Sequence, residues 1–346
     1  MLWTLLFATG YPIMTGDNQP GSGEKRAEAQ ELLPGVVVPD RARCKDGFIV
    51  MTLVLGDVGA KSFGSMMRWA AEYDAIEEDI AEHDWTGMFD LLMGGKISPA
   101  DIQRAFDQFV AFLATRTKAE VQQRALAGKW LIGPAYTAAD LMVDSQLAAR
   151  DYWQEVDGLQ HPGAFARLSE TPILYRGPAP RLGADLSILD EVAREPLVPA
   201  RPASPRAAIF EGLKVADFSS VGALPLVSKD LAPLRATVLR VESEKHVDPL
   251  RMIPPWKHGI PTVSTGFAMA NFNQSKIGLA LDLGTPEGRE VALRMVDWAD
   301  VVTESFTPGS AAKLGLDYAT LRRRKPELIM ISSCMRGQTG PEAGYT

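Results

Sequence analysis

The chain has 346 residues, and 46 % of them are hydrophobic, so it can form two domains with buried cores. Its 36 basic and 43 acidic residues give a net charge of -7, which argues against a nucleic-acid-binding protein because phosphate recognition requires concentrated positive charge. Only two cysteines occur, Cys44 and Cys334, and their distant positions argue against a disulfide framework and a zinc site. We therefore expect a protein of the reducing cytoplasm that uses no metal.

Two stretches near the beginning of the chain have simple interpretations. The opening residues, MLWTLLFA, are far fewer than the roughly 20 apolar residues that span a bilayer, so we expect a buried helix or strand and no membrane partner. Residues 16–26, GDNQPGSGEKR, are rich in glycine but precede no strand-to-helix pattern. A flexible loop is therefore favoured over a phosphate-binding loop.

The following part of the chain mixes strand and helix patterns. Residues 44–57, CKDGFIVMTLVLGD, predict a hairpin with Lys-Asp-Gly as its turn. Ser98 as N-cap and Pro99 at the first helical position predict a helix. The apolar face of that helix comprises Ile102, Phe106, Phe109 and Leu113. A capping box, TKAE at residues 117–120, begins the next helix, and AADLMVDSQLAARDYW is also helical. We expect a smaller α+β domain.

A proline-rich stretch divides the chain. Four prolines without any periodic pattern lie between Glu195 and Arg206. This composition favours an extended, semi-rigid linker. We therefore predict an N-terminal segment of residues 1–194, a linker of residues 195–208 and a C-terminal segment of residues 209–346.

After the linker, strands and helices alternate. We predict strands at residues 213–220, 236–243, 279–283 and 300–305, and a further strand in the IMISS run. Helices separate them, and one begins with Thr285 as N-cap and Pro286 at its first position. Its apolar stripe comprises Ala292, Met295, Val296 and Ala299. The pattern predicts an α/β fold with a Rossmann-like parallel sheet, flanking helices and ligands at the carboxyl ends of the strands.

Common catalytic motifs are missing from the sequence. The turn after the first strand, SSVGALP, has the single Gly222 where a dinucleotide fingerprint needs three glycines. There is also no Walker loop, no Gly-x-Ser-x-Gly elbow and no His-Glu-x-x-His helix.

A series of other motifs occurs in order between residues 213 and 346: LKVADFSS, VLRVES, LALDLGTPEGRE, ADVVTESFTPGSAAKLGLDYATL and LIMISSCMRGQTGPEAGYT. Together they resemble the N-terminal part of the family III CoA-transferases, which include formyl-CoA:oxalate and carnitine CoA-transferases and the α-methylacyl-CoA racemases. Before the linker, FLATRTKAEVQQRALAGKWLIGPAYTAADLMVDSQLAARDYWQEVD through TPILYRGPAPRLGADLSILDE resembles the C-terminal portion of the same family. The order is reversed relative to a single enzyme.

Three explanations of this reversed order can be separated. A circular permutation would keep all parts, but the family's middle section occurs at neither end. A two-part protein would need complete cores in both halves. The simplest hypothesis is the junction of two tandem transferase units, with the C-terminal portion of the first at residues 1–194 and the N-terminal portion of the second at residues 209–346.

The resemblance implies acyl-CoA-dependent transfer of CoA between carboxylic acids through an aspartyl covalent intermediate. In the family the aspartate lies beyond the Gly-Gln-Thr-Gly-Pro loop, so it would lie outside this chain, and we expect the fragment alone to be inactive. A racemase-like enzyme and a non-catalytic scaffold half of a fused transferase remain alternatives. The resemblance also implies acyl-CoA and a carboxylic acid as partners, and an interlocked homodimer or an intramolecular pseudo-dimer.

The resemblance also assigns candidate CoA-binding residues but no catalytic residue within the chain. Matched to the family's CoA contacts are Gly222, Ala223, Leu281, Asp282, Leu283, Gly284, Ser305, Phe306, Thr307, Lys313 and Tyr345. Several positions depart from the family pattern, including Ser305, which stands where the family has Asn. Gly222 stands where transferases often have Gln, Ser243 where many have Arg, and Lys313 where Arg usually meets phosphate. We therefore expect weakened CoA binding in this unit.

Overall fold

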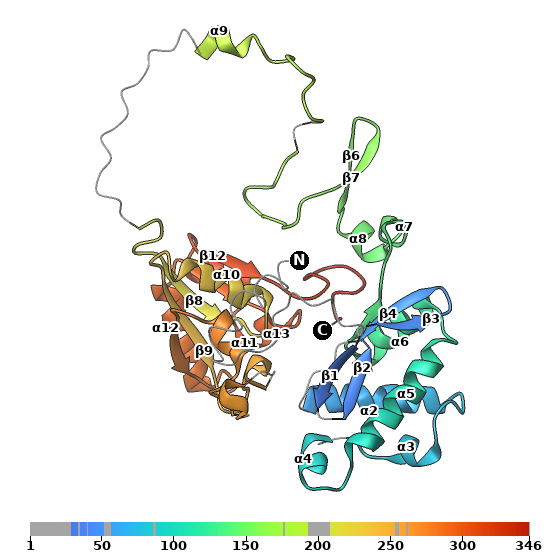
Figure 1. Ribbon diagram of the computed structural model, residues 1–346. Helices are drawn as coiled ribbons and strands as arrows, with labels where there is room; N and C mark the ends of the chain where they lie inside the picture. The colour runs from blue at the N-terminus through green and yellow to red at the C-terminus, as the bar shows by residue number, and fades with distance from the viewer. Residues whose placement is uncertain are drawn as a thin grey trace. The chain divides into compact units, whose positions relative to one another are not determined.

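Figure 1 shows the computed structural model of the chain. It describes residues 29–33, 35–39, 41–51, 57–85, 88–175, 177–192, 208–252, 256–260 and 262–345. The apolar opening, the glycine-rich residues 16–26 and residues 195–207 of the predicted linker lie outside the described residues. The described parts form two compact units. One contains the described residues of Met1–Ala135, Phe210–Gln338 and Glu342–Thr346, and the other those of Tyr136–Ile209 and Thr339–Pro341.

Strands in the N-terminal part of the first unit are antiparallel. They are β1 (Ala29–Leu33) paired with β2 (Val36–Pro39), and β3 (Arg41–Cys44), β4 (Gly47–Met51) and β5 (Ile132–Pro134) in a three-stranded sheet. The predicted hairpin is confirmed, because Cys44 pairs with Gly47 across the Lys45–Asp46 turn. The hairpin begins at Arg41, before the predicted range of residues 44–57, and residues 52–56 of that range lie outside the described residues.

The same part contains five described helices, of which the last two pack on these strands. The five helices are α2 (Asp57–Ala71), α3 (Glu78–Glu82), α4 (Met88–Met93), α5 (Pro99–Leu113) and α6 (Lys118–Gly128). The predicted caps are confirmed. The side chain of Ser98 accepts from Asp101 N–H, and that of Thr117 accepts from Glu120 N–H, which satisfies donors that a helix start leaves unpaired. The predicted apolar face of α5 is fully buried, and Phe63 packs edge-on to Trp85 beside it.

A five-stranded sheet forms the C-terminal part of the first unit. Its strands are β8 (Lys214–Phe218), β9 (Thr237–Glu242), β10 (Ile277–Ala280), β11 (Val301–Glu304) and β12 (Ile329–Ser332). The order is β10-β9-β8-β11-β12, and every pair is parallel. The predicted Rossmann-like arrangement is confirmed. We call the edge formed by the carboxyl ends of these strands the carboxyl edge.

Helices cover both faces of this sheet, as Figure 1 shows. The connecting helices are α10 (Ala223–Leu231), α11 (Phe267–Phe272), α12 (Pro286–Trp298), α13 (Ser310–Leu314) and α14 (Tyr318–Arg324), with short 3-10 turns at Pro249–Met252 and Lys257–Gly259. Side chains of α12 and α14 pack on Ala216 and Val302. Ala232, at the end of α10, packs on Val215 and Val301 from the opposite face. Adjacent residues of a strand therefore face different helix layers.

Two predicted element boundaries were wrong. The third parallel strand was expected at residues 279–283, but β10 ends at Ala280. Leu281 still donates to the carbonyl of Glu242, and the carboxylate of Asp282 then accepts from Gly284 N–H, which turns the chain away from the sheet. The helical stretch after Tyr136 is also divided, because a new helix begins with Asp144 as N-cap.

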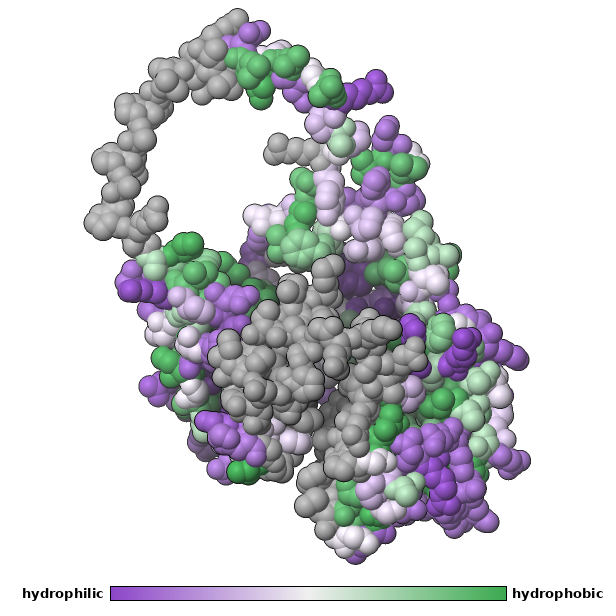
Figure 2. All heavy atoms as spheres, in the orientation of Figure 1, coloured by the Kyte–Doolittle hydropathy of each residue, from purple (hydrophilic) through white to green (hydrophobic). Residues whose placement is uncertain are grey.

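The second unit has short elements. They are α7 (Ala138–Met142), α8 (Ser145–Ala149), β6 (Trp153–Val156), β7 (Leu159–Pro162) and α9 (Ile188–Val192). Gln146 is buried and donates to the carbonyl of Thr339 at 2.7 Å. Large apolar side chains near α9, such as Leu186 and Leu189, are exposed, and Figure 2 shows apolar surface there.

Within the described residues, no helix combines the length and apolarity required to cross a bilayer.

Candidate functional site

The predicted CoA-binding residues lie mainly in loops that follow parallel strands. Gly222 and Ala223 follow β8, Leu281 to Gly284 follow β10, and Ser305 to Thr307 follow β11. Because the strands are parallel, all three loops are at the carboxyl edge. The fold thus brings together residues that are up to 85 positions apart in sequence, as between Ser220 and Ser305.

The loop after β8 is fixed by its neighbours. Ser305 Oγ accepts from Ser220 N–H at 2.8 Å and donates to the Ser220 carbonyl at 3.1 Å. The next residue, Val221, donates its N–H to the carboxylate of Asp248. Gly222 then serves as the N-cap of α10 without a side-chain cap, and Ala223 is its first residue.

The loop after β10 is organised around one carboxylate. Asp282 Oδ2 lies 2.7 Å from Lys245 Nζ, and Asp282 Oδ1 accepts from Gly284 N–H at 2.8 Å. The ammonium of Lys245 holds the pKa of Asp282 below its ordinary value. Leu281 and Leu283 pack against the buried cluster of α12. The loop therefore has two apolar side chains packed beneath it, and the exposed ammonium of Lys245, which follows β9, lies beside it.

The loop after β11 leads into α13. Phe306 packs on the buried cluster and donates its N–H to Glu304 at 2.7 Å, while the carbonyl of Thr307 accepts from Ser310 N–H. Lys313 lies in α13 and its side chain is exposed, so its charge is available to an anionic ligand.

Tyr345 packs elsewhere in the first unit. Its ring contacts the buried cluster of the N-terminal part, and its hydroxyl donates to the carbonyl of Ile132 in β5. The hydroxyl also lies close to Gly133 of β5, where a Cβ would be 3.4 Å from it. These contacts describe a docking role for Tyr345.

A buried ion pair lies beneath the carboxyl edge. Lys276 Nζ is 2.9 Å from Asp217 Oδ2 and donates also to the Pro225 carbonyl and to Asn273 Oδ1. Asp217 further accepts from the hydroxyls of Ser219, Ser228 and Thr303. Burial alone would raise the pKa of Asp217, but the Lys276 charge and these hydroxyls bring the pKa below its ordinary value. The carboxylate is therefore ionised in the core.

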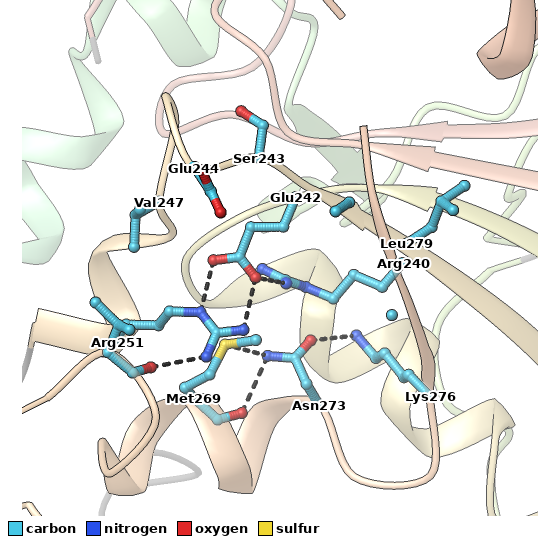
Figure 3. Close-up of a pocket in the computed structure, with 13 residues that line it drawn as sticks. Arg240, Glu242, Ser243, Glu244, Val247, Arg251, Met269, Asn273, Lys276 and Leu279 are labelled. Carbon is cyan, nitrogen blue, oxygen red and sulfur yellow. Dashed lines mark hydrogen bonds and ion pairs between the residues drawn. The ribbon is translucent and has the colours of Figure 1, made fainter. Parts of the chain in front are cut away.

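A pocket of about 400 Å³ lies beside β9 and β10, and Figure 3 shows its lining. The carboxylate of Glu242 points between two guanidinium groups. Arg251 Nε lies 2.6 Å from Glu242 Oε1, and Arg240 Nη1 lies 2.8 Å from Glu242 Oε2. Arg240 also pairs with Asp248. One part of the pocket wall is therefore an ordered network of charges, and Met269, Leu279 and Val247 contribute apolar side chains.

The pKa values of the two carboxyl groups in this network shift in opposite directions. Burial raises the pKa of Glu242, but hydrogen bonds from Arg251, the Asp248 N–H and Arg240 outweigh it and lower the pKa to about 2. For Asp248, burial prevails over its hydrogen bonds and over the charge of Arg240, and its pKa is raised.

The residues that support the loops were not predicted from the sequence. They are Asp217, Val221, Arg240, Glu242, Asp248, Arg251 and Lys276. One signal was present in the sequence. Asp217 and Lys276 are charged residues at otherwise apolar strand positions or strand boundaries, and a buried charge needs a partner. The pairing itself could not be read from the sequence, because these residues are 59 positions apart.

Potential metal ligands do not gather in the part of the chain that the structure describes. No group of three or more His, Cys, Asp or Glu side chains among these residues could hold a metal ion.

Comparison with known proteins identifies the class of this fold. The model of the CoA-transferase family III matches residues 4–186 and 210–346. The chain therefore belongs to CoA-transferase family III.

Individual relatives match parts of the chain or most of it. The CoA-transferase/lyase DddD of Marinomonas sp. is 40 % identical over 121 residues, covering 35 % of this chain and 13 % of that protein. A probable CoA-transferase of Mycobacterium tuberculosis is 23 % identical over 342 residues, covering 95 % of this chain and 38 % of that protein. A CAIB/BAIF family protein of Brucella suis has a crystal structure that is 35 % identical, with a TM-score of 0.37, and covers 40 % of this chain and 36 % of that one.

The Marinomonas and mycobacterial relatives are both longer than the region they share with this chain. The chain spans 13 % of the length of the first and 38 % of the length of the second.

Proposed function

We propose that this chain is part of a CoA-transferase that moves CoA between carboxylic acids, with acyl-CoA bound at the carboxyl edge. The observation that carries the proposal is the convergence of the loops after β8, β10 and β11 at this edge. Lys313 provides exposed positive charge for the phosphates, and Leu281 and Phe306 provide apolar contacts. The eleven predicted residues remain the proposed CoA-binding residues. Among them, the hydroxyls of Ser305 and Tyr345 hold the backbone of Ser220 and Ile132.

The chemistry that we propose is covalent. An aspartate carboxylate attacks the thioester carbonyl, the CoA thiolate leaves and a mixed anhydride forms. The thiolate then attacks the aspartyl carbonyl and releases the first acid, which gives an aspartyl-CoA thioester. A second carboxylate receives the CoA by the same exchange in reverse, and the aspartate is regenerated. We place this aspartate outside the chain, so the chain alone would be inactive.

We further propose that residues 1–194 and 209–346 are portions of two tandem units joined by the linker of residues 195–208. Two observations support this. The family model matches the chain in two separate segments, and the mycobacterial relative aligns across both while being more than twice as long. Two units in one polypeptide would form an intramolecular pseudo-dimer, and separate chains an interlocked homodimer. We place the protein in the cytoplasm.

The test uses the full parent open reading frame. The expressed protein is incubated with an acyl-CoA, and peptide mass spectrometry is used to find a CoA or acyl adduct on an aspartate. An adduct that is lost when this aspartate is changed to alanine supports the transferase. Exchange of the acyl α-proton with solvent, without an adduct, would instead support a racemase. Absence of both reactions would leave a scaffold half and would overturn the proposed activity.

A further inference from the structure

Val221 has a strained backbone at the carboxyl edge. Its φ is 63°, in the left-handed region that β-branched residues rarely adopt. It lies between β8 and α10, directly before Gly222 and Ala223. Strain of this kind persists only where the surrounding contacts impose it, and it is concentrated at functional sites.

The contacts that impose it come from two sides. Asp248 accepts the Val221 N–H at 3.2 Å from Oδ2 and 3.3 Å from Oδ1. Ser305 holds the preceding residue through both the N–H and the carbonyl of Ser220. Consecutive backbone N–H groups are thus fixed by residues that follow β9 and β11, the strands on either side of β8.

Asp248 is itself held rigidly. Its carboxylate pairs with Arg240, and its Oδ1 accepts from Leu250 N–H at 2.9 Å. The side chains of Asp248 and Arg240 are only 1 % and 5 % exposed. Arg240 is fixed in turn by Glu242 at 2.8 Å. The position of the Val221 N–H is therefore set by a buried network that extends to the pocket of Figure 3.

We propose that Asp248 and Ser305 are positioning residues that impose the left-handed conformation on Val221 and so present Gly222 and Ala223 to acyl-CoA. Their substrate is that of the proposed function, on which this inference rests. Both residues affect CoA binding through the backbone conformation of Ser220 and Val221, which they hold by hydrogen bonds. Ser305, which the family resemblance places at the cofactor, uses its hydroxyl for the backbone of Ser220.

The first test is a double-mutant cycle on CoA affinity, measured by isothermal titration of CoA into the 346-residue chain. Asp248→Asn removes the charge that holds the turn, and we expect affinity to fall about ten-fold. Asn adopts the left-handed region more readily than Val, so V221N reduces the need for Asp248. In the V221N background, D248N should weaken affinity less than about three-fold. A merely structural role of Asp248 predicts the same loss in both backgrounds, and that result would overturn the inference.

The second test measures the turn without any ligand. Hydrogen exchange of peptides that cover residues 219–224 should accelerate in D248N and in Ser305→Ala, but not in D297N. The control D297N also loses an ion pair, between Asp297 and Arg324 on the exposed surface. If D248N fails to fold, as judged by circular dichroism, S305A replaces it in both tests. Ser305 is only partly buried, so we expect S305A to fold.

The two tests separate this inference from the proposed function. If the wild-type chain binds no CoA, the proposed CoA site is wrong, and hydrogen exchange still decides whether Asp248 and Ser305 hold the turn. Unchanged exchange in both variants would overturn the inference even if CoA binds.

Discussion

Lys276 Nζ lies 2.9 Å from Asp217 Oδ2, and the two side chains are 2 % and 0 % exposed. Lys276 precedes the edge strand β10, whereas Asp217 lies in the central strand β8, so the ion pair joins two non-adjacent strands. All three N–H bonds of the ammonium have acceptors, since the Pro225 carbonyl and Asn273 Oδ1 also lie at 2.9 Å.

Removal of one member of this pair should strongly destabilise the parallel sheet. In Lys276→Met the carboxylate of Asp217 stays buried without its cation, and we expect a loss of about 3–5 kcal/mol in the free energy of unfolding. Urea titration monitored by circular dichroism measures this loss. D297N, which breaks the exposed pair with Arg324, is the control and should change stability much less. Similar losses in K276M and D297N would contradict this role of the buried pair.

The Glu242 network should make stability depend on pH. The folded pKa of Glu242 is about 2 against an ordinary value of 4.5, so its ionisation stabilises the fold above pH 4.5, and this contribution is lost as pH falls from 4.5 towards 2. In Glu242→Gln, up to about 3 kcal/mol of this pH dependence should disappear. The measurement is urea unfolding at several pH values. E244Q, at an exposed carboxylate of the same pocket, should keep the wild-type profile.

Arg235 occupies a left-handed position that suits glycine. Its φ is 76°, and Ala236 N–H bonds to the Leu231 carbonyl where α10 ends, as in a helix C-terminal turn. Arg235→Gly should therefore stabilise the chain by about 1 kcal/mol, despite loss of the exposed contact with Glu211 at 3.8 Å. Thermal unfolding measures the change. An equal gain from R235A, which keeps a Cβ, would show that backbone strain is not the cause.

Tyr345 should stabilise the edge of the three-stranded antiparallel sheet. Tyr345→Phe removes the hydroxyl that donates to the Ile132 carbonyl, and we expect a loss of about 1 kcal/mol in local opening free energy. Hydrogen exchange of peptides containing β5 measures it. Y318F is the matched control, because Tyr318 lies in α14 and packs against Arg322. Unchanged β5 exchange in Y345F would contradict the docking role.

Local signals in the sequence predicted much of this fold. Ser98, Thr117 and Thr285 cap helices as expected, because an N-cap depends on neighbouring residues only. Alternating strand and helix patterns predicted the parallel sheet. The end of β10 was misplaced because Asp282 turns the chain through a bond to Gly284 that apolar patterning does not record.

The candidate site was less predictable. Family motifs located the loops of the carboxyl edge, but the role of Asp248 in holding Val221 depends on a contact between residues 27 positions apart. The left-handed φ of Val221 is imposed by such tertiary contacts and runs against its local preference. Only the folded chain shows this relationship.

Titration of CoA into the 346-residue chain tests the central claim, that the carboxyl edge is a CoA-binding site, most directly. We predict saturable binding that weakens about ten-fold in Lys313→Ala, because an exposed cation of α13 would be lost from the phosphates. K61A, which removes an exposed lysine of α2, should leave affinity unchanged. Absence of saturable binding, or equal losses in K313A and K61A, would contradict the claim.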